Sequence, residues 1–191
     1  MRWQHALTFI LVLATTTPLV SAGQPLSAKS PDGSLEVTVT NVSGQVSYSV
    51  SRFGNPVLGK SRLGLVLADR SLADNLVITD TAEATVDTTW EQVWGERRFV
   101  KDHHKELRVH VASTTDGSLR MTVVFRVFDD GVGFRYEVPE QPGLSRIVIM
   151  DEATEFALAE DPTAWWIGAY QWNRYEYLYR ESPLSKAADT L

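Results

Sequence analysis

The residues best suited to chemistry lie near the end of the chain, in a stretch dense in aromatic rings. Seven aromatic residues fall within fifteen positions: Trp165, Trp166, Tyr170, Trp172, Tyr175, Tyr177 and Tyr179. Flat ring faces make C–H contacts with pyranose sugars, and the indole N–H and phenol O–H reach sugar hydroxyls. The stretch therefore predicts a carbohydrate-binding surface, whose sugar contacts we assign to Trp165, Trp166, Trp172 and Tyr175.

The same rings also have a purely structural interpretation. Tyr175, Tyr177 and Tyr179 alternate along the chain, and alternate residues of a strand share one face. Such a face could simply pack against a core. Polar side chains among the rings, including Asn173, favour the sugar surface, so both interpretations stay open.

Two histidines invite a metal-site hypothesis. His103 and His104 stand next to each other, with Glu106 two residues further on. On a strand only His104 and Glu106 would share a face, and two ligands without a third make a poor metal site. We therefore interpret residues 103–106 as a solvated polar turn.

Carboxylate pairs could instead serve glycoside hydrolysis, which uses one acid and one base or nucleophile. Glu91 and Glu96 flank Trp94, but nothing in the local pattern buries either carboxyl group or separates their pKa values. Asp129 and Asp130 precede a glycine, which is ordinary turn chemistry. The chain has no cysteine, which excludes thiolate catalysis and disulfides.

The overall charge and the first residues limit partners and location. The net charge is −6, without a basic tract, so a nucleic-acid partner is not expected. Arg2, an apolar run over 6–14 and small residues up to Ala22 predict a signal peptide at 1–22. Residues 23–191 then form one domain, secreted or periplasmic and without a membrane span after cleavage.

The strongest element that could position these residues is a hairpin over 119–138. Its arms alternate apolar residues: Leu119, Met121, Val123, Phe125 and Val127, then Val132, Phe134, Tyr136 and Val138. Between the arms, Asp130-Gly131 predicts a tight turn with a positive φ at the glycine. Arg126 and Arg135 fall on the face opposite the apolar residues.

Further extended segments recur every eight to twelve residues, with turn residues between them: 35–40, 46–50, 63–67, 76–89, 107–111, 146–150 and 154–158. No window shows a helical period over eleven residues. The predicted fold class is therefore all-β, an antiparallel β-sandwich.

Four motifs together resemble the N-terminal domain of glycoside hydrolase family 97. They are SPDG at 30–33, the segment 90–107, FRVFDDGVGFRY at 125–136, and WW followed by YEYLYRE within 165–181. The family consists of secreted α-glucosidases and α-galactosidases. The resemblance implies a galactose-mutarotase-like β-supersandwich whose last strands lie past residue 191, and an oligosaccharide substrate. We interpret Trp90 and Trp94, which fit the family pattern, as core residues.

The resemblance also implies a role for one carboxylate. In the family, a Tyr-Glu pair late in this domain meets a catalytic (β/α)₈ barrel, and its glutamate binds an active-site calcium ion. Tyr175-Glu176 matches that pair, so Glu176 is the implied Ca²⁺ ligand; a solvated strand glutamate is the alternative. Calcium takes six to eight oxygens, so the barrel must supply the others. Because the barrel also carries the catalytic residues, this chain is not expected to be catalytic alone.

Two other functions remain possible on the sequence. A free-standing secreted carbohydrate-binding module would use the rings of residues 165–179. A purely structural domain would bury them all. The preference for glucosides or galactosides, and for inversion or retention, is decided in the family by residues of the barrel.

Overall fold

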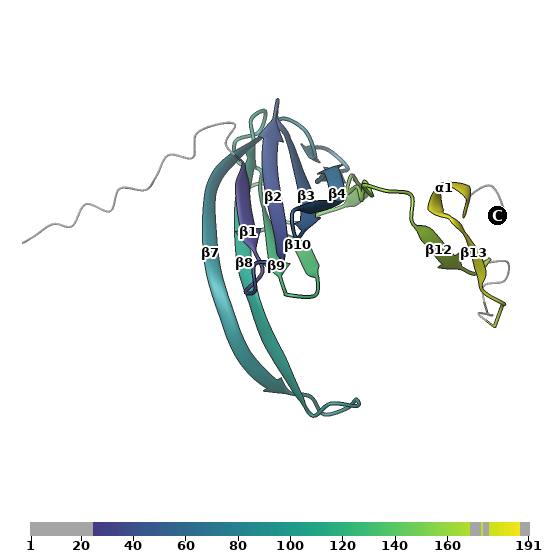
Figure 1. The fold of residues 1–191 in the computed structure, drawn as a ribbon. Helices are drawn as coiled ribbons and strands as arrows, with labels where there is room; N and C mark the ends of the chain where they lie inside the picture. Colours follow the sequence, from purple (N-terminus) through teal and green to yellow (C-terminus); the bar gives the residue numbers. More distant parts are fainter. Residues whose placement is uncertain (1–24, 169–172, 174–175, 188–191) are drawn as a thin grey trace, which may run out of the picture.

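The computed structural model describes residues 25–168, 173 and 176–187, almost entirely as strands (Figure 1). The elements are β1 (Leu26–Lys29), β2 (Leu35–Val42), β3 (Gln45–Arg52), β4 (Asn55–Arg62), β5 (Leu65–Leu67), β6 (Ser71–Leu72), β7 (Leu76–Glu91), β8 (Phe99–Ser113), β9 (Arg120–Val127), β10 (Val132–Glu137), β11 (Ile149–Glu152), β12 (Thr163–Trp166), β13 (Arg180–Pro183) and α1 (Leu184–Ala187). No helix in these residues is long and apolar enough to cross a membrane.

Two four-stranded antiparallel sheets form the body of the molecule, in the orders β1-β2-β3-β4 and β10-β9-β8-β7. Their inner faces share one core. The Tyr48 ring of the first sheet lies 5.8 Å from the ring of Phe125 and 5.3 Å from that of Phe134, both in the second. The structure confirms the predicted all-β fold with antiparallel sheets and is consistent with a β-sandwich.

The alternation of the sequence explains which side chains fill this core. The apolar residues of β9 at positions 121, 123, 125 and 127 are all buried, and those of β10 pack against them. Tyr48 is the polar exception, but its hydroxyl donates to the Glu155 carbonyl at 3.0 Å. Burial and the neighbouring Tyr136 raise the pKa of Tyr48 to about 12, so the phenol stays neutral.

The predicted hairpin of residues 119–138 is confirmed, but its turn is not the expected one. Pairing stops at Val127 and Val132, which leaves a four-residue connection. The Phe128 amide donates to the Gly131 carbonyl at 2.8 Å, and Gly131 does not take a positive φ. The prediction was wrong because a four-residue loop reverses the chain without the left-handed glycine that a two-residue turn needs.

A small third sheet has the order β11-β5-β6. Only β11 is a strand among residues 146–158, where two strands were predicted. Residues 157–159 instead bond singly to β4, as in the 2.7 Å bond from the Gly59 amide to the Ala157 carbonyl. Gly64 is essential here: its φ is +152°, and a Cβ would lie 2.4 Å from the Ala73 Cα atom.

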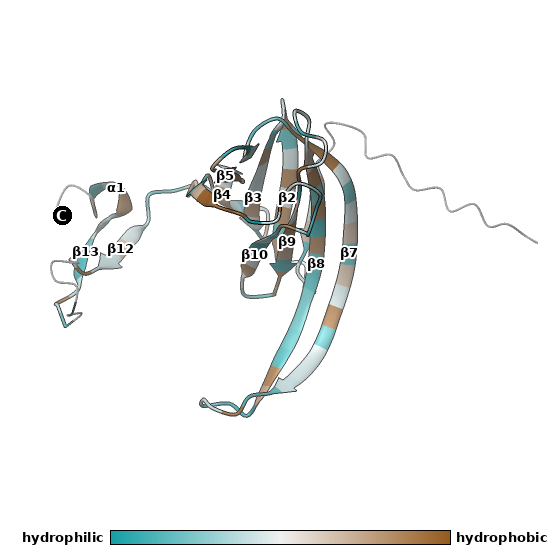
Figure 2. Ribbon diagram, turned by 180° about the vertical axis from the view of Figure 1, so that it is seen from behind, coloured by the Kyte–Doolittle hydropathy of each residue, from teal (hydrophilic) through white to brown (hydrophobic). Residues whose placement is uncertain are grey.

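Two parts of the chain project from the sandwich (Figure 1). β9 pairs with residues 105–112 of β8, so residues 99–104 pair with β7 alone among the described strands. We call residues 86–104 the distal ribbon. The second projecting part is the C-terminal unit, formed by β12, β13 and α1, which lies away from the sheets in both views (Figures 1 and 2).

Candidate functional site

The C-terminal unit holds the described part of the predicted sugar surface. Its two tryptophans sit next to each other on β12, so they point to opposite sides. Trp166 is half-buried: its Nε1 donates to the Ser182 hydroxyl at 3.1 Å, and the Arg180 guanidinium lies 5.2 Å from its ring centroid. Trp165 is 66% exposed. Trp165 therefore offers an open ring, whereas Trp166 helps to hold the hairpin together.

The segment before β13 carries the implied metal ligand. Glu176 is exposed, and Tyr177 beside it is half-buried. A hollow of about 360 Å³ is lined by Gly168, Tyr177, Leu178, Tyr179 and Arg180. Trp172 and Tyr175 lie outside the described residues, so their predicted sugar contacts stay predictions.

Calcium fits the chemistry of Glu176 but needs other ligands as well. A carboxylate is the hard oxygen donor that Ca²⁺ prefers, and an exposed one is free to be shared with a second domain. Within the described residues, no three His, Asp or Glu side chains come together as a metal site. One glutamate gives at most two of the six to eight oxygens required, so this chain could contribute only part of the site.

The predicted polar turn at residues 103–106 is wrong. These residues belong to β8, since pairing with β7 continues as far as Phe99. His104 is fully buried, with its Nδ1 2.7 Å from Asp102 Oδ1 and its ring 4.8 Å from that of Phe128. Its Nε2 has no hydrogen-bond partner among the residues that the structure describes. Phe128 covers the histidine from the loop between β9 and β10, and this contact could not be predicted from local sequence.

The interpretation of Trp90 and Trp94 as core residues is also wrong. They are 50% and 85% exposed, because they lie at the tip of the distal ribbon, where no sheet faces them. Hydrogen bonds nevertheless hold the tip in place: the backbone amide of Gln92 donates to the Arg98 carbonyl at 2.9 Å, and Arg98 Nε donates to Glu91 Oε1 at 2.7 Å. That exposed ion pair occupies the Glu91 carboxylate.

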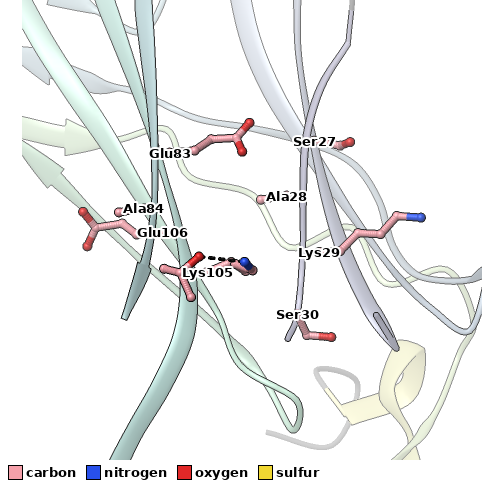
Figure 3. Close-up of a pocket in the computed structure, with 9 residues that line it drawn as sticks. Ser27, Ala28, Lys29, Ser30, Glu83, Ala84, Lys105 and Glu106 are labelled. Carbon is pink, nitrogen blue, oxygen red and sulfur yellow. Dashed lines mark hydrogen bonds between the residues drawn. The ribbon is translucent and has the colours of Figure 1, made fainter. Parts of the chain in front are cut away.

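An opening of about 320 Å³ lies between β1 and the β7–β8 pair, at one edge of the sandwich (Figure 3). Lys105 Nζ donates to Thr85 Oγ1 at 2.6 Å inside it, and Glu83 points across it toward β1. Glu106 turns away from it, to the other face of the sheet (Figure 3). The opening is a seam between two sheets, and it brings together no set of groups with an evident chemistry.

Sequence reasoning missed a polar network on the outer face of the second sheet. Arg108 donates to Glu106 at 3.2 Å and also to Glu137, while Arg126 donates to Glu106 at 3.2 Å. The hydrogen bond from Arg135 is the main reason that the pKa of Glu137 is lowered, and Arg108 adds to it; burial opposes both. Polar residues alternating along β8 were the available signal, but the network depends on the register of three strands.

The sequence is similar to that of known glycoside hydrolases. Residues 28–190 match the family described as "Glycosyl-hydrolase 97 N-terminal". Over 163 residues the chain is 30% identical to a probable retaining alpha-galactosidase of Streptomyces bingchenggensis, covering 85% of this chain and 24% of that protein. A retaining alpha-galactosidase of Bacteroides thetaiotaomicron is 22% identical over 159 residues, covering 83% of this chain and 22% of its own length.

A solved structure agrees with these matches. It is a glycoside hydrolase family 97 enzyme of Pseudoalteromonas sp. strain K8 in complex with panose, with a TM-score of 0.78 and 40% identity. The match covers 85% of this chain and 25% of that one. The chain thus spans about a quarter of the length of the relatives that it matches.

Proposed function

Since the chain belongs to glycoside hydrolase family 97, as its N-terminal domain, we propose that it serves a secreted, calcium-dependent exo-α-glycosidase without being catalytic itself. It shapes the sugar pocket beside a (β/α)₈ catalytic barrel and presents Glu176 to a calcium ion there. The signal peptide at residues 1–22 exports the protein.

The observation that carries this proposal is the match over residues 28–190, together with the 0.78 TM-score to an enzyme that binds panose. Panose is an oligosaccharide, and the two curated relatives are described as alpha-galactosidases. An α-linked oligosaccharide is therefore the substrate class that these relatives support.

The described carboxyl groups support a non-catalytic role. A glycosidase acid needs a raised pKa to hold its proton at neutral pH. The clear shifts among the described carboxyl groups are all downward, at Asp32, Asp116, Glu137 and Asp161. Each is lowered chiefly by hydrogen bonds, which favour the ionised form. These groups are suited to structure rather than to proton donation.

A domain exchange tests the proposal. Residues 28–190 of this chain replace the matching region of the Pseudoalteromonas enzyme, and panose hydrolysis is followed as Ca²⁺ is titrated. We expect hydrolysis, and we expect Glu176→Gln to weaken the apparent calcium affinity about 10- to 100-fold, as loss of a metal-site contact does.

The matched control is Glu181→Gln, an exposed glutamate five residues further on. It should leave the calcium dependence unchanged. A folded chimera without activity would contradict the proposed domain role. Equal calcium affinity in the Glu176→Gln chimera and its parent would contradict the metal role alone.

The exposed ring of Trp165 favours a second candidate, a carbohydrate-binding module. It predicts that the isolated chain binds an α-glucan, measured by affinity electrophoresis, and that Trp165→Ala or Trp166→Ala weakens this binding. Retained binding in both variants would argue against it.

A further inference from the structure

A further hollow lies on the outer face of the β10-β9-β8-β7 sheet, and none of the residues that line it belongs to the C-terminal unit. We call it the outer hollow. Its volume is about 750 Å³, within the usual range for small-ligand sites of about 300–1,000 Å³. The polar groups that line it are those of Thr79, Asp80, Arg108, His110, Arg120, Thr122 and Glu137.

The register explains why these groups meet. Arg108 and His110 alternate with the core residues Val109 and Val111 on β8, so they point away from the core. Thr122 stands opposite His110 on β9, and Asp80 stands opposite it on β7. Three strands therefore place their polar side chains on one surface.

Most of these side chains are already held in position. Arg108 is fixed between Glu106 and Glu137, and Glu137 is held in turn by Arg135 at 2.6 Å. His110 Nδ1 lies 2.9 Å from Thr122 Oγ1. Groups that are ordered before binding lose little conformational freedom when a ligand arrives, which favours affinity.

The outer hollow also has unused hydrogen-bonding capacity. A guanidinium carries five N–H donors, and the two bonds of Arg108 leave others available. The Arg120 guanidinium makes no hydrogen bond or ion pair in the described part of the chain, while Gln141 holds its backbone through bonds of 2.7 and 3.1 Å. Asp80 uses one carboxylate oxygen on the Thr81 amide, at 2.8 Å. Donors and acceptors are thus both present.

The charges select the class of ligand. Two guanidinium groups and two carboxylates in the lining balance each other, so neither an anion nor a cation gains a net attraction. A sugar, by contrast, is neutral and presents hydroxyls that both donate and accept. Val138 and Pro139 add an apolar wall for its C–H faces. We propose that the outer hollow is an oligosaccharide-binding site, separate from Glu176 and from the aromatic rings of the C-terminal unit.

The test titrates the 191-residue chain with panose by isothermal calorimetry and by NMR. We expect saturable binding that Arg120→Ala weakens at least about tenfold, because one charged hydrogen-bond donor is lost. Arg120 is exposed at the start of β9, so its side chain can be removed without opening the core. Circular dichroism and the urea midpoint verify that the variant folds.

Two control variants locate the binding. Arg146→Ala removes another exposed arginine outside the outer hollow and should leave the affinity unchanged. Trp94→Ala, which removes an exposed ring at the tip of the distal ribbon, should do the same. Thr122→Val, which releases His110 but keeps the side-chain shape, should weaken binding by a smaller factor than Arg120→Ala.

Three results would overturn the inference: no panose binding, binding lost in Trp165→Ala but kept in Arg120→Ala, or competition by inorganic phosphate, which would indicate an anion site. None of them bears on Glu176, whose test is the calcium dependence of the chimera. Failure of this inference and failure of the proposed function are therefore distinguishable.

Discussion

The strands β7 and β8 run through both the sandwich and the distal ribbon. Only their part within the sandwich has a second sheet packed against it, and the burial of their side chains differs accordingly. Within the sandwich, the inner side chains of β8, such as Leu107 and Val109, are fully buried. Along the distal ribbon the same strand has no partner sheet, and large apolar residues at its tip face solvent. In Figure 2 the ribbon is mostly teal or pale, with a few separate brown bands, including some near its tip.

The comparison indicates that burial comes from the facing sheet and not from strand pairing alone. The core belongs to the two facing sheets, whereas Trp165 and Glu176 lie in the projecting C-terminal unit. An oligosaccharide pocket that includes them therefore needs a further surface, such as the barrel that we propose.

The largest expected difference follows from truncating one aromatic residue in each region. Phe125→Ala should lower the free energy of unfolding by about 3–5 kcal/mol, because it leaves a cavity between the sheets. Trp94→Ala should change it by less than about 0.5 kcal/mol, because that ring is solvated. Urea denaturation measures both, and similar losses in the two variants would break the comparison.

The second largest difference in stability is expected between alanine substitutions at two glycines. Gly64→Ala should destabilise the fold by about 2–3 kcal/mol, since the new methyl group would meet Ala73 and the backbone there is strained for other residues. Gly54→Ala, where φ is +79° and the space is open, should cost about 1–2 kcal/mol from the left-handed conformation alone. Equal urea midpoints for the two variants would contradict the close contact at Gly64.

The half-buried hydroxyl of Tyr136 should have a smaller effect. Tyr136 Oη accepts from the Gly64 amide at 3.0 Å and lies 2.6 Å from Thr154 Oγ1, which joins the second sheet to the third. Tyr136→Phe should lower stability by about 1–2 kcal/mol, because both partners lose a bond. Tyr179→Phe, in the exposed C-terminal unit, should have no measurable effect in the same assay. An unchanged stability in Tyr136→Phe would show that these hydrogen bonds contribute little to the free energy of unfolding.

The smallest expected effect is on how stability falls at low pH. Asp32, in the turn between β1 and β2, has its pKa lowered from 3.8 to about 2, first by the Ser30 hydroxyl and then by the Ser34 amide. Because the folded pKa lies below the unfolded one, this carboxylate stabilises the fold above about pH 4. That contribution is lost as the pH falls from about 4 to 2.

Asp32→Asn should therefore flatten the decline in the urea midpoint between pH 4 and 2. Asp80→Asn, at an exposed position on β7, is the matched control and should keep the wild-type slope. Identical slopes in wild type and Asp32→Asn would argue against the turn hydrogen bonds as the cause of the lowered pKa.

Local pattern was enough to predict most of the sandwich. Alternation located β2, β3, β7, β9 and β10, because one buried face leaves a period of two in the sequence. It could not predict which strands extend past their partner sheet, so the surroundings of Trp90 and Trp94 were misjudged. A core position and a solvated ribbon position look alike in sequence.

Some features of the candidate sites were likewise predictable from the sequence, and others were not. Trp165 was singled out as a sugar contact because it lies in a stretch rich in aromatic residues, and its ring is exposed to solvent. The contacts of Arg108 with Glu106 and Glu137 could not be foreseen, because they join strands whose register is fixed only by the whole sheet. His104 shows the same limit, since a loop distant in sequence covers it.

The most direct test of the central claim is an activity measurement on the isolated 191-residue chain. Hydrolysis of p-nitrophenyl α-glucoside and α-galactoside is followed with and without Ca²⁺. The proposed role as a non-catalytic domain predicts a rate equal to that of buffer in all conditions. Turnover that copurifies with the chain would contradict it and would place a complete catalytic site within these residues.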